Sequence, residues 1–155
     1  MLDRPIVTFA ADGALYAVPV DCVQEILDLQ PISPLPRVPH ALLGVTNLRG
    51  GNVPVLDLRR LLGRAEAEDT PQTRILVIWI ENAGSKMLAG LRTDRVVEVC
   101  HLDDAALKPV DDTQYLGWSG GAIVGLGRRD GQIVCVLDLE QLFKGALPDV
   151  EVAAA

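Results

Sequence analysis

The chain has 155 residues, a formal net charge of −7, and 49% hydrophobic but only 4% aromatic residues. The acidic balance argues against nucleic acid or an anionic membrane as a partner, because phosphate groups are bound by clustered Lys and Arg. Three widely spaced cysteines without a C-x-x-C motif argue against a disulfide framework or a zinc site. We therefore expect buried thiols, no metal, no cofactor and a cytoplasmic location. No apolar run is long enough for membrane insertion.

The first strands are predicted at Pro5–Phe9 and Ala14–Val18, with Asp12-Gly13 in the turn between them. We expect both strands to belong to the first structural unit. The segment Val20–Leu29 predicts a helical turn followed by a strand. Four prolines make Gln30–His40 a non-helical connection, because proline lacks the backbone donor and restricts the residue before it.

A second hairpin is predicted from Leu43–Leu48 and Val53–Leu56, which flank Arg49–Asn52. The consecutive glycines inside that turn supply the positive φ angles that a tight hairpin needs. Asp57 follows at the position of a helix N-cap, and Gly63 fits the C-cap of a helix of one or two turns.

The polar, acidic segment Arg64–Thr73 is the predicted boundary between two halves of the chain. The second half repeats the β-rich pattern of the first. Its predicted strands are Ile75–Ile80, Lys86–Leu91, Val96–Leu102, Ile123–Leu126 and Ile133–Leu137.

An internal duplication supports this division. Asp57-Leu58-x-x-Leu61-Leu62 recurs in the second half as Asp138-Leu139-x-x-Leu142-Phe143, and Glu25 recurs as Glu98. We expect a first unit at about 1–69 and a second at 70–155, sharing a hydrophobic contact, with strands that can be exchanged at the junction. The second copy is the longer one between Gly117 and Gly131, and the segment 118–130 predicts a mobile or bulged glycine-rich excursion.

A catalytic constellation is not evident. Gly117–Gly121 fits the G-x-S-x-G pattern of α/β-hydrolases, but the preceding residues are not strand-like, and no histidine follows His101. The carboxylates Asp21, Asp57, Asp94 and Asp138 recur in both copies, which favours structural roles. We expect no enzymatic activity, and a small serine hydrolase using Ser119 is the alternative from another class.

The run from Asn47 to Leu58, N-L-R-G-x-x-V-P-V-x-D-L, resembles the CheW-like family of bacterial chemotaxis coupling proteins. The segments Val23–Ile26 and Val136–Leu142 carry the same resemblance, which covers nearly the whole chain. It implies a mainly β fold, in which a single CheW-like domain at 1–155 consists of two SH3-like five-stranded β-barrel subdomains with short helices.

The resemblance also implies a non-enzymatic adaptor that couples the cytoplasmic tip of a methyl-accepting chemoreceptor to the regulatory domain of a CheA-type histidine kinase. A paralogue serving twitching or surface sensing is the alternative. The positions that match the family's receptor-binding residues are Arg49, Asn47, Glu25, Val23 and Gly44. Arg49 could instead only cap its own hairpin or pair with Glu25. Kinase-binding residues stay unassigned, because the second copy lacks N-L-R-G.

Overall fold

A computed structural model describes residues 4–82, 84–104, 106–108 and 122–147. The described part contains ten strands, of which the first five are β1 (Ile6–Ala11), β2 (Ala14–Pro19), β3 (Val23–Asp28), β4 (Leu42–Leu48) and β5 (Gly51–Asp57). The other five are β6 (Arg74–Asn82), β7 (Ser85–Thr93), β8 (Arg95–Cys100), β9 (Ile123–Arg129) and β10 (Gln132–Leu137). The short helices are the 3₁₀ helix η1 (Val20–Cys22), α1 (Leu58–Leu61) and α2 (Leu139–Phe143). The mainly β prediction is confirmed, as is the helical turn before β3.

In three of the hairpins, a two-residue turn connects the two strands. The turn residues have positive φ angles: 51° and 79° at Asp12-Gly13, 50° and 84° at Arg49-Gly50, and 50° and 80° at Asp130-Gly131. Two positive φ angles in succession define the turn whose twist matches that of the flanking antiparallel strands. Arg49 is therefore held in a left-handed conformation at the end of β4.

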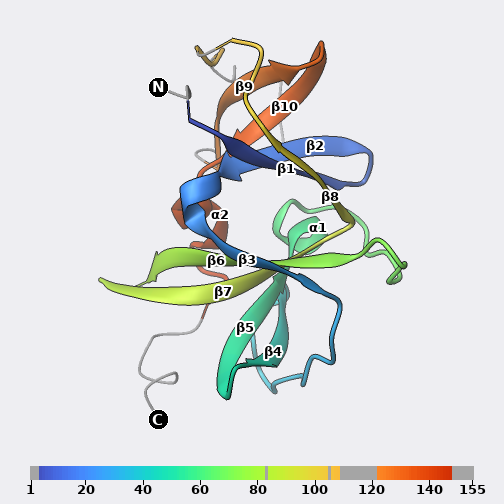
Figure 1. The fold of residues 1–155 in the computed structure, drawn as a ribbon. Helices are drawn as coiled ribbons and strands as arrows, with labels where there is room; N and C mark the ends of the chain where they lie inside the picture. Colours follow the sequence, from blue (N-terminus) through green and yellow to red (C-terminus); the bar gives the residue numbers. More distant parts are fainter. Residues whose placement is uncertain (1–3, 83, 105, 109–121, 148–155) are drawn as a thin grey trace.

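The strands form two five-stranded sheets, with the orders β8-β1-β2-β10-β9 and β3-β6-β7-β5-β4 (Figure 1). The prediction that the first hairpin belongs to the first unit is wrong, because β1 and β2 pair with strands of the second half. In return, β6 and β7 complete the sheet of β3, β4 and β5. The two hairpins are exchanged between the halves, and closure of each sheet into a barrel stays a prediction.

The duplication extends to the register of the parallel strand pairs. Val55 on β5 pairs with Gly90 on β7, and Val136 on β10 pairs with Ala17 on β2. The two pairs are equivalent, because in the sequence repeat Val136 corresponds to Val55 and Gly90 corresponds to Ala17. Both sheets therefore contain one equivalent pair of parallel strands, and in each pair one strand comes from the first half of the chain and the other from the second half.

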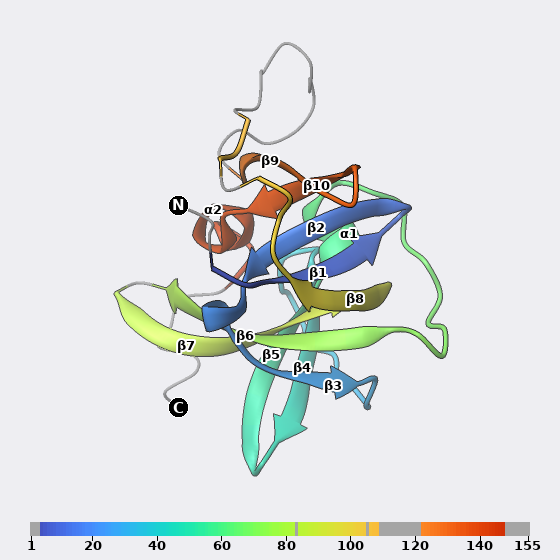
Figure 2. The same cartoon turned by 45° about the horizontal axis from the view of Figure 1, so that its top comes forward.

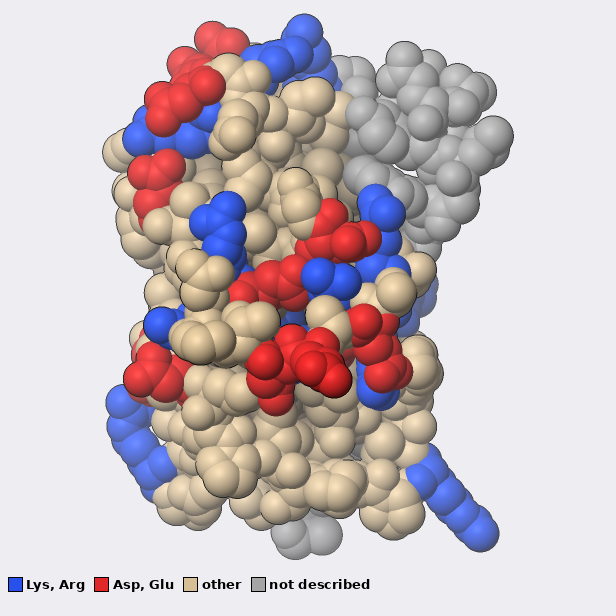
Figure 3. Space-filling view, turned by 90° about the vertical axis from the view of Figure 1, so that its right-hand side faces the viewer, with Lys and Arg blue, Asp and Glu red and all other residues tan. Residues whose placement is uncertain are grey.

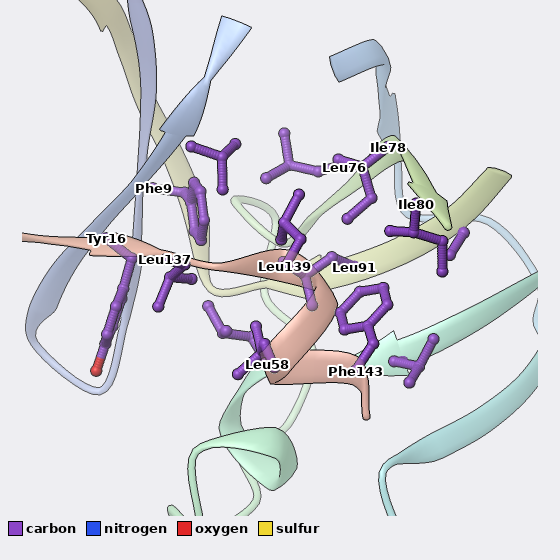
Figure 4. Close-up of a cluster of buried hydrophobic side chains, with 14 of the residues drawn as sticks. Phe9, Tyr16, Leu58, Leu76, Ile78, Ile80, Leu91, Leu137, Leu139 and Phe143 are labelled. Atoms are coloured by element: carbon purple, nitrogen blue, oxygen red, sulfur yellow. The ribbon is translucent and has the colours of Figure 1, made fainter. Parts of the chain in front are cut away.

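The largest hydrophobic cluster contains residues from both sheets and both α-helices (Figure 4). Phe9 and Tyr16 enter it from one sheet, and Leu76 and Leu91 enter it from the other. Figures 1 and 2 show α1 and α2 in the region between the sheets, where Leu58 is fully buried. Smaller clusters lie within each sheet. The expected hydrophobic contact between the two copies is thus confirmed.

The structure refines two local predictions. The expected excursion at 118–130 lies partly outside the described residues; Ile123–Arg129 form the strand β9, and its register with β10 shifts between Ile123 and Gly125. Asp57 occupies the N-cap of α1, but its side chain makes no capping hydrogen bond, whereas Asp138 Oδ1 accepts one from the Gln141 backbone N–H at 3.3 Å.

Trp118–Gly121, with Ser119, lie outside the described residues. No helix in the described part of the chain is long and apolar enough to cross a membrane.

Candidate functional site

The β4–β5 hairpin presents Arg49 at its turn, at the end of the structure where the hairpin extends away from the other sheet (Figure 1). The arginine side chain is 68% exposed. Its Nη1 atom lies 2.6 Å from Oε1 of Glu25 on β3. Arg49 therefore pairs with Glu25, which places two of the five predicted site residues in direct contact, and its receptor contact stays a prediction.

The environments of the two partners differ. Glu25 is only 24% exposed, and its Oε1 atom is buried facing Arg49. A guanidinium has five N–H donors in a planar fork, so the exposed Arg49 keeps donors available to a second carboxylate. A pair with one exposed partner contributes at most about 1 kcal/mol to folding. Arg49 can therefore bind a second carboxylate through its free donors while it keeps its contact with Glu25.

Asn47 supports the turn. Its Oδ1 atom accepts a hydrogen bond from the Gly50 backbone N–H at 3.3 Å, and its own side chain is exposed. The residue thus lies beside Arg49, as the sequence predicts, and also shapes the loop that carries it.

Gly44 and Val23 differ from these three residues in their surroundings. Gly44 is buried with a φ of 148°, and an added Cβ would collide with the carbonyl oxygen of Ser33. Val23 is half-buried, pairs with Ile78 and packs against the main cluster. Any contribution of Gly44 to binding would act through the backbone geometry.

Trp79 is a surface feature that the sequence analysis missed. The residue is 38% exposed, its Nε1 donates to Gln24 Oε1 at 3.0 Å, and Lys86 Nζ lies 5.9 Å from the ring centroid. It lines an open groove of about 420 Å³, whose other lining residues include Asp21, Lys86, Val124 and Glu140. Trp79 was hidden in the sequence because it lies within the uninterrupted apolar run Ile75–Ile80.

A band of charged residues crosses the side of the molecule that carries α1 and residues 64–73 (Figure 3). Arg92, only 6% exposed, pairs with buried Asp57 at 3.0 Å and with Asp69 at 2.5 Å. Arg59 pairs with Asp94 at 2.7 Å, and its hydrogen bonds lower the pKa of that carboxyl. Because these carboxylates already bind arginines, the prediction of structural roles for Asp57 and Asp94 agrees with their contacts.

Two of the three described cysteines, Cys100 and Cys135, are buried. Burial raises the pKa of the Cys135 thiol to about 11, and burial also raises the pKa of Cys100. A protonated, buried thiol is a poor nucleophile. His40 and His101 are exposed. In the described ranges, no group of three or more His, Cys, Asp or Glu side chains could hold a metal ion.

The second sheet offers a related but different surface. Glu98 on β8 is the counterpart of Glu25, and it accepts a hydrogen bond from Arg129 Nε at 3.3 Å. The repeat that aligns Asp57 with Asp138 places Asp130 at the position of Arg49. Arg129 is less exposed than Arg49, at 32% against 68%. The exposed arginine in the hairpin turn is thus particular to the first copy.

Comparisons with known proteins agree with this architecture. The family described as "CheW-like domain" matches residues 5–146. Chemotaxis protein CheW from Rhizobium meliloti is 27% identical over 140 residues, covering 90% of this chain and 87% of that protein. Protein FrzA from Myxococcus xanthus is 37% identical over 101 residues, covering 65% of this chain and 61% of that protein.

A solved structure supports the same assignment. The crystal structure of the scaffolding protein TtCheW from Thermoanaerobacter tengcongensis superposes with a TM-score of 0.77 and 28% sequence identity. The match covers 90% of this chain and 87% of that one. Two equivalent five-stranded sheets, the hairpin with N-L-R-G and the match over residues 5–146 lead to one assignment. The chain belongs to the CheW-like domain family, a family of non-enzymatic scaffolding proteins of bacterial chemotaxis.

Proposed function

We propose that this protein is a cytoplasmic adaptor that links the signalling tip of a methyl-accepting chemoreceptor to the regulatory domain of a CheA-type histidine kinase. Relatives named as chemotaxis proteins and a related structure described as a scaffolding protein support the proposal. The protein performs no reaction of its own. Its activity consists of holding two partners together.

The receptor contact is the Arg49 hairpin, and the observation that supports this assignment is the Arg49 side chain, which is 68% exposed although it pairs with Glu25. A tight turn fixes the backbone of Arg49, so binding would require ordering of the side chain alone. A receptor carboxylate can be bound through the free donors of the guanidinium. Glu25 lies beside the contact and holds the arginine when no receptor is bound.

The test compares two charge reversals at arginines that each pair with a strand glutamate. Arg49→Glu should weaken binding to a purified receptor signalling fragment by about tenfold to a hundredfold, since a charge-assisted hydrogen bond contributes about 1.5–3 kcal/mol. Arg129→Glu is the matched control, because it changes the net charge equally and disrupts the pair with Glu98. Binding to the kinase is measured separately for both variants.

Two results would count against the proposal. Wild-type receptor affinity of Arg49→Glu would remove the hairpin from the receptor contact. Absence of binding between the wild-type protein and both a receptor fragment and a kinase regulatory domain from the same genome would remove the coupling function itself. Identification of the receptor that co-purifies would also separate a chemotaxis adaptor from a paralogue that serves twitching or surface sensing.

A further inference from the structure

The outer edge of β4 is covered by the chain segment that follows β3. Ser33 N–H donates to the Val45 carbonyl at 2.7 Å, and Val45 N–H donates back to the Ser33 carbonyl at 2.9 Å. This pairing brings Ser33 so close to Gly44 that a side chain at position 44 would collide with it. Residues 30–33 therefore lie along the strand that leads into the Arg49 turn.

Gln30 extends this contact toward the turn. Its Nε2 atom donates to Thr46 Oγ1 at 2.8 Å and to the Asn47 carbonyl at 2.6 Å. Thr46 is only 3% exposed, and its hydroxyl donates to the Pro31 carbonyl at 2.8 Å. A single side-chain amide therefore joins the end of the β3 segment to two consecutive residues of β4.

The hydrogen bonds continue from Asn47 to the turn itself. Asn47 receives the Gln30 donor on its carbonyl, and its side chain accepts from Gly50 N–H. Arg49 lies between these two contact points, and its charge partner Glu25 is on β3. Both the backbone and the side chain of Arg49 are thus held by the segment that contains β3 and Gln30.

We infer that Gln30 is a positioning residue, which fixes the β4–β5 turn through Thr46 and Asn47 so that Arg49 is presented in a binding-competent orientation. This inference rests on the proposed receptor contact of Arg49. Gln30 does not itself bind the receptor. Its effect on binding is carried by Arg49.

The test measures the affinity for a purified soluble signalling fragment of a methyl-accepting receptor from the same genome. Gln30→Met keeps the length of the side chain and removes both donors. It should weaken binding about fivefold, the equivalent of one net hydrogen bond. Gln132→Met, at an exposed position on β10 in the other sheet, is the matched control and should bind as the wild type does. Thr46→Val, which removes the hydroxyl acceptor, should weaken binding in the same direction as Gln30→Met.

A double-mutant cycle separates positioning from general stability. In an Arg49→Ala background, Gln30→Met should cause no further loss of affinity, because the group that it positions is absent. Amide hydrogen exchange gives a local readout: Gly50 N–H should exchange faster in Gln30→Met, while Gly131 N–H, which is bound by Asp103 in the other sheet, should not change.

The outcomes distinguish the inference from the proposed function. If Arg49→Ala binds the fragment as tightly as the wild type, the receptor contact itself is refuted, and the inference falls with it. If Arg49→Ala weakens binding but Gln30→Met does not, only the positioning role is refuted. An equal loss from Gln30→Met in both backgrounds would also refute it, because the effect would then not pass through Arg49.

Discussion

Replacement of Gly44 by alanine tests whether this residue acts by allowing close approach of two backbone segments. The new Cβ would collide with the Ser33 carbonyl and lie 2.9 Å from the Cα of Pro34. Separation of the segments breaks the two hydrogen bonds between Ser33 and Val45, which together contribute about 2 kcal/mol. The positive φ adds strain of about 1 kcal/mol. The expected loss in the free energy of unfolding is therefore about 3 kcal/mol.

Gly13→Ala provides the matched control. Gly13 also has a positive φ, of 79°, but no atom lies within 4 Å of an added Cβ. This variant should lose only the strain contribution of about 1 kcal/mol. Urea denaturation of both variants gives the comparison, and the Gly44→Ala loss corresponds to a decrease in Tm of roughly 6–12 °C. Equal stability of the two variants would refute the collision and leave Gly44 free for a direct role in binding.

Two further predictions concern the shared core and the charged band. Leu58→Ala should lower the free energy of unfolding by about 2–5 kcal/mol, because Leu58 is fully buried in the cluster shared by both sheets. Far-ultraviolet circular dichroism and Trp fluorescence should still report one urea transition, and two separate transitions would contradict a shared core. Hydrogen bonds from Arg59 lower the pKa of Asp94 in the folded protein, so the stabilisation is present above about pH 4 and is lost as the pH falls through the lowered value. Asp94→Asn should be less stable than the wild type at pH 7 and lose less stability on acidification, as measured by thermal unfolding between pH 7 and pH 3.

Much of the local structure could be predicted because backbone requirements are visible in the residue types. Asp12-Gly13 and Gly50 mark turns that need positive φ angles, and the strands beside them follow. The hairpin with Arg49 was likewise predictable, since its turn and strands are encoded within a few residues. The contact of Arg49 with Glu25 was one of several possibilities that the sequence left open, and only the folded structure shows that it forms.

The repeat left an exchange of strands at the junction open, but it could not show which hairpins are exchanged. The duplication maps β2 onto β7, so both hairpins present similar apolar patterns to either sheet. The apolar pattern of a hairpin cannot determine which of two equivalent sheets it joins. Gln30 was missed for another reason. It lies in a proline-rich connection and donates a hydrogen bond to the backbone carbonyl of Asn47. A sequence does not reveal which backbone carbonyls at the edge of a sheet can accept such a bond.

The exchange of hairpins matters for an adaptor that must hold two partners in a fixed relation. Each sheet has three strands from one half of the chain and two from the other, so neither half can complete its sheet alone. The main hydrophobic cluster also draws on both sheets. Independent movement of the two halves of the chain would therefore break strand pairing, and independent movement of the two sheets would break the apolar contacts of this cluster. A surface on one sheet is consequently joined to a surface on the other through one shared hydrophobic cluster, an arrangement that suits the proposed adaptor.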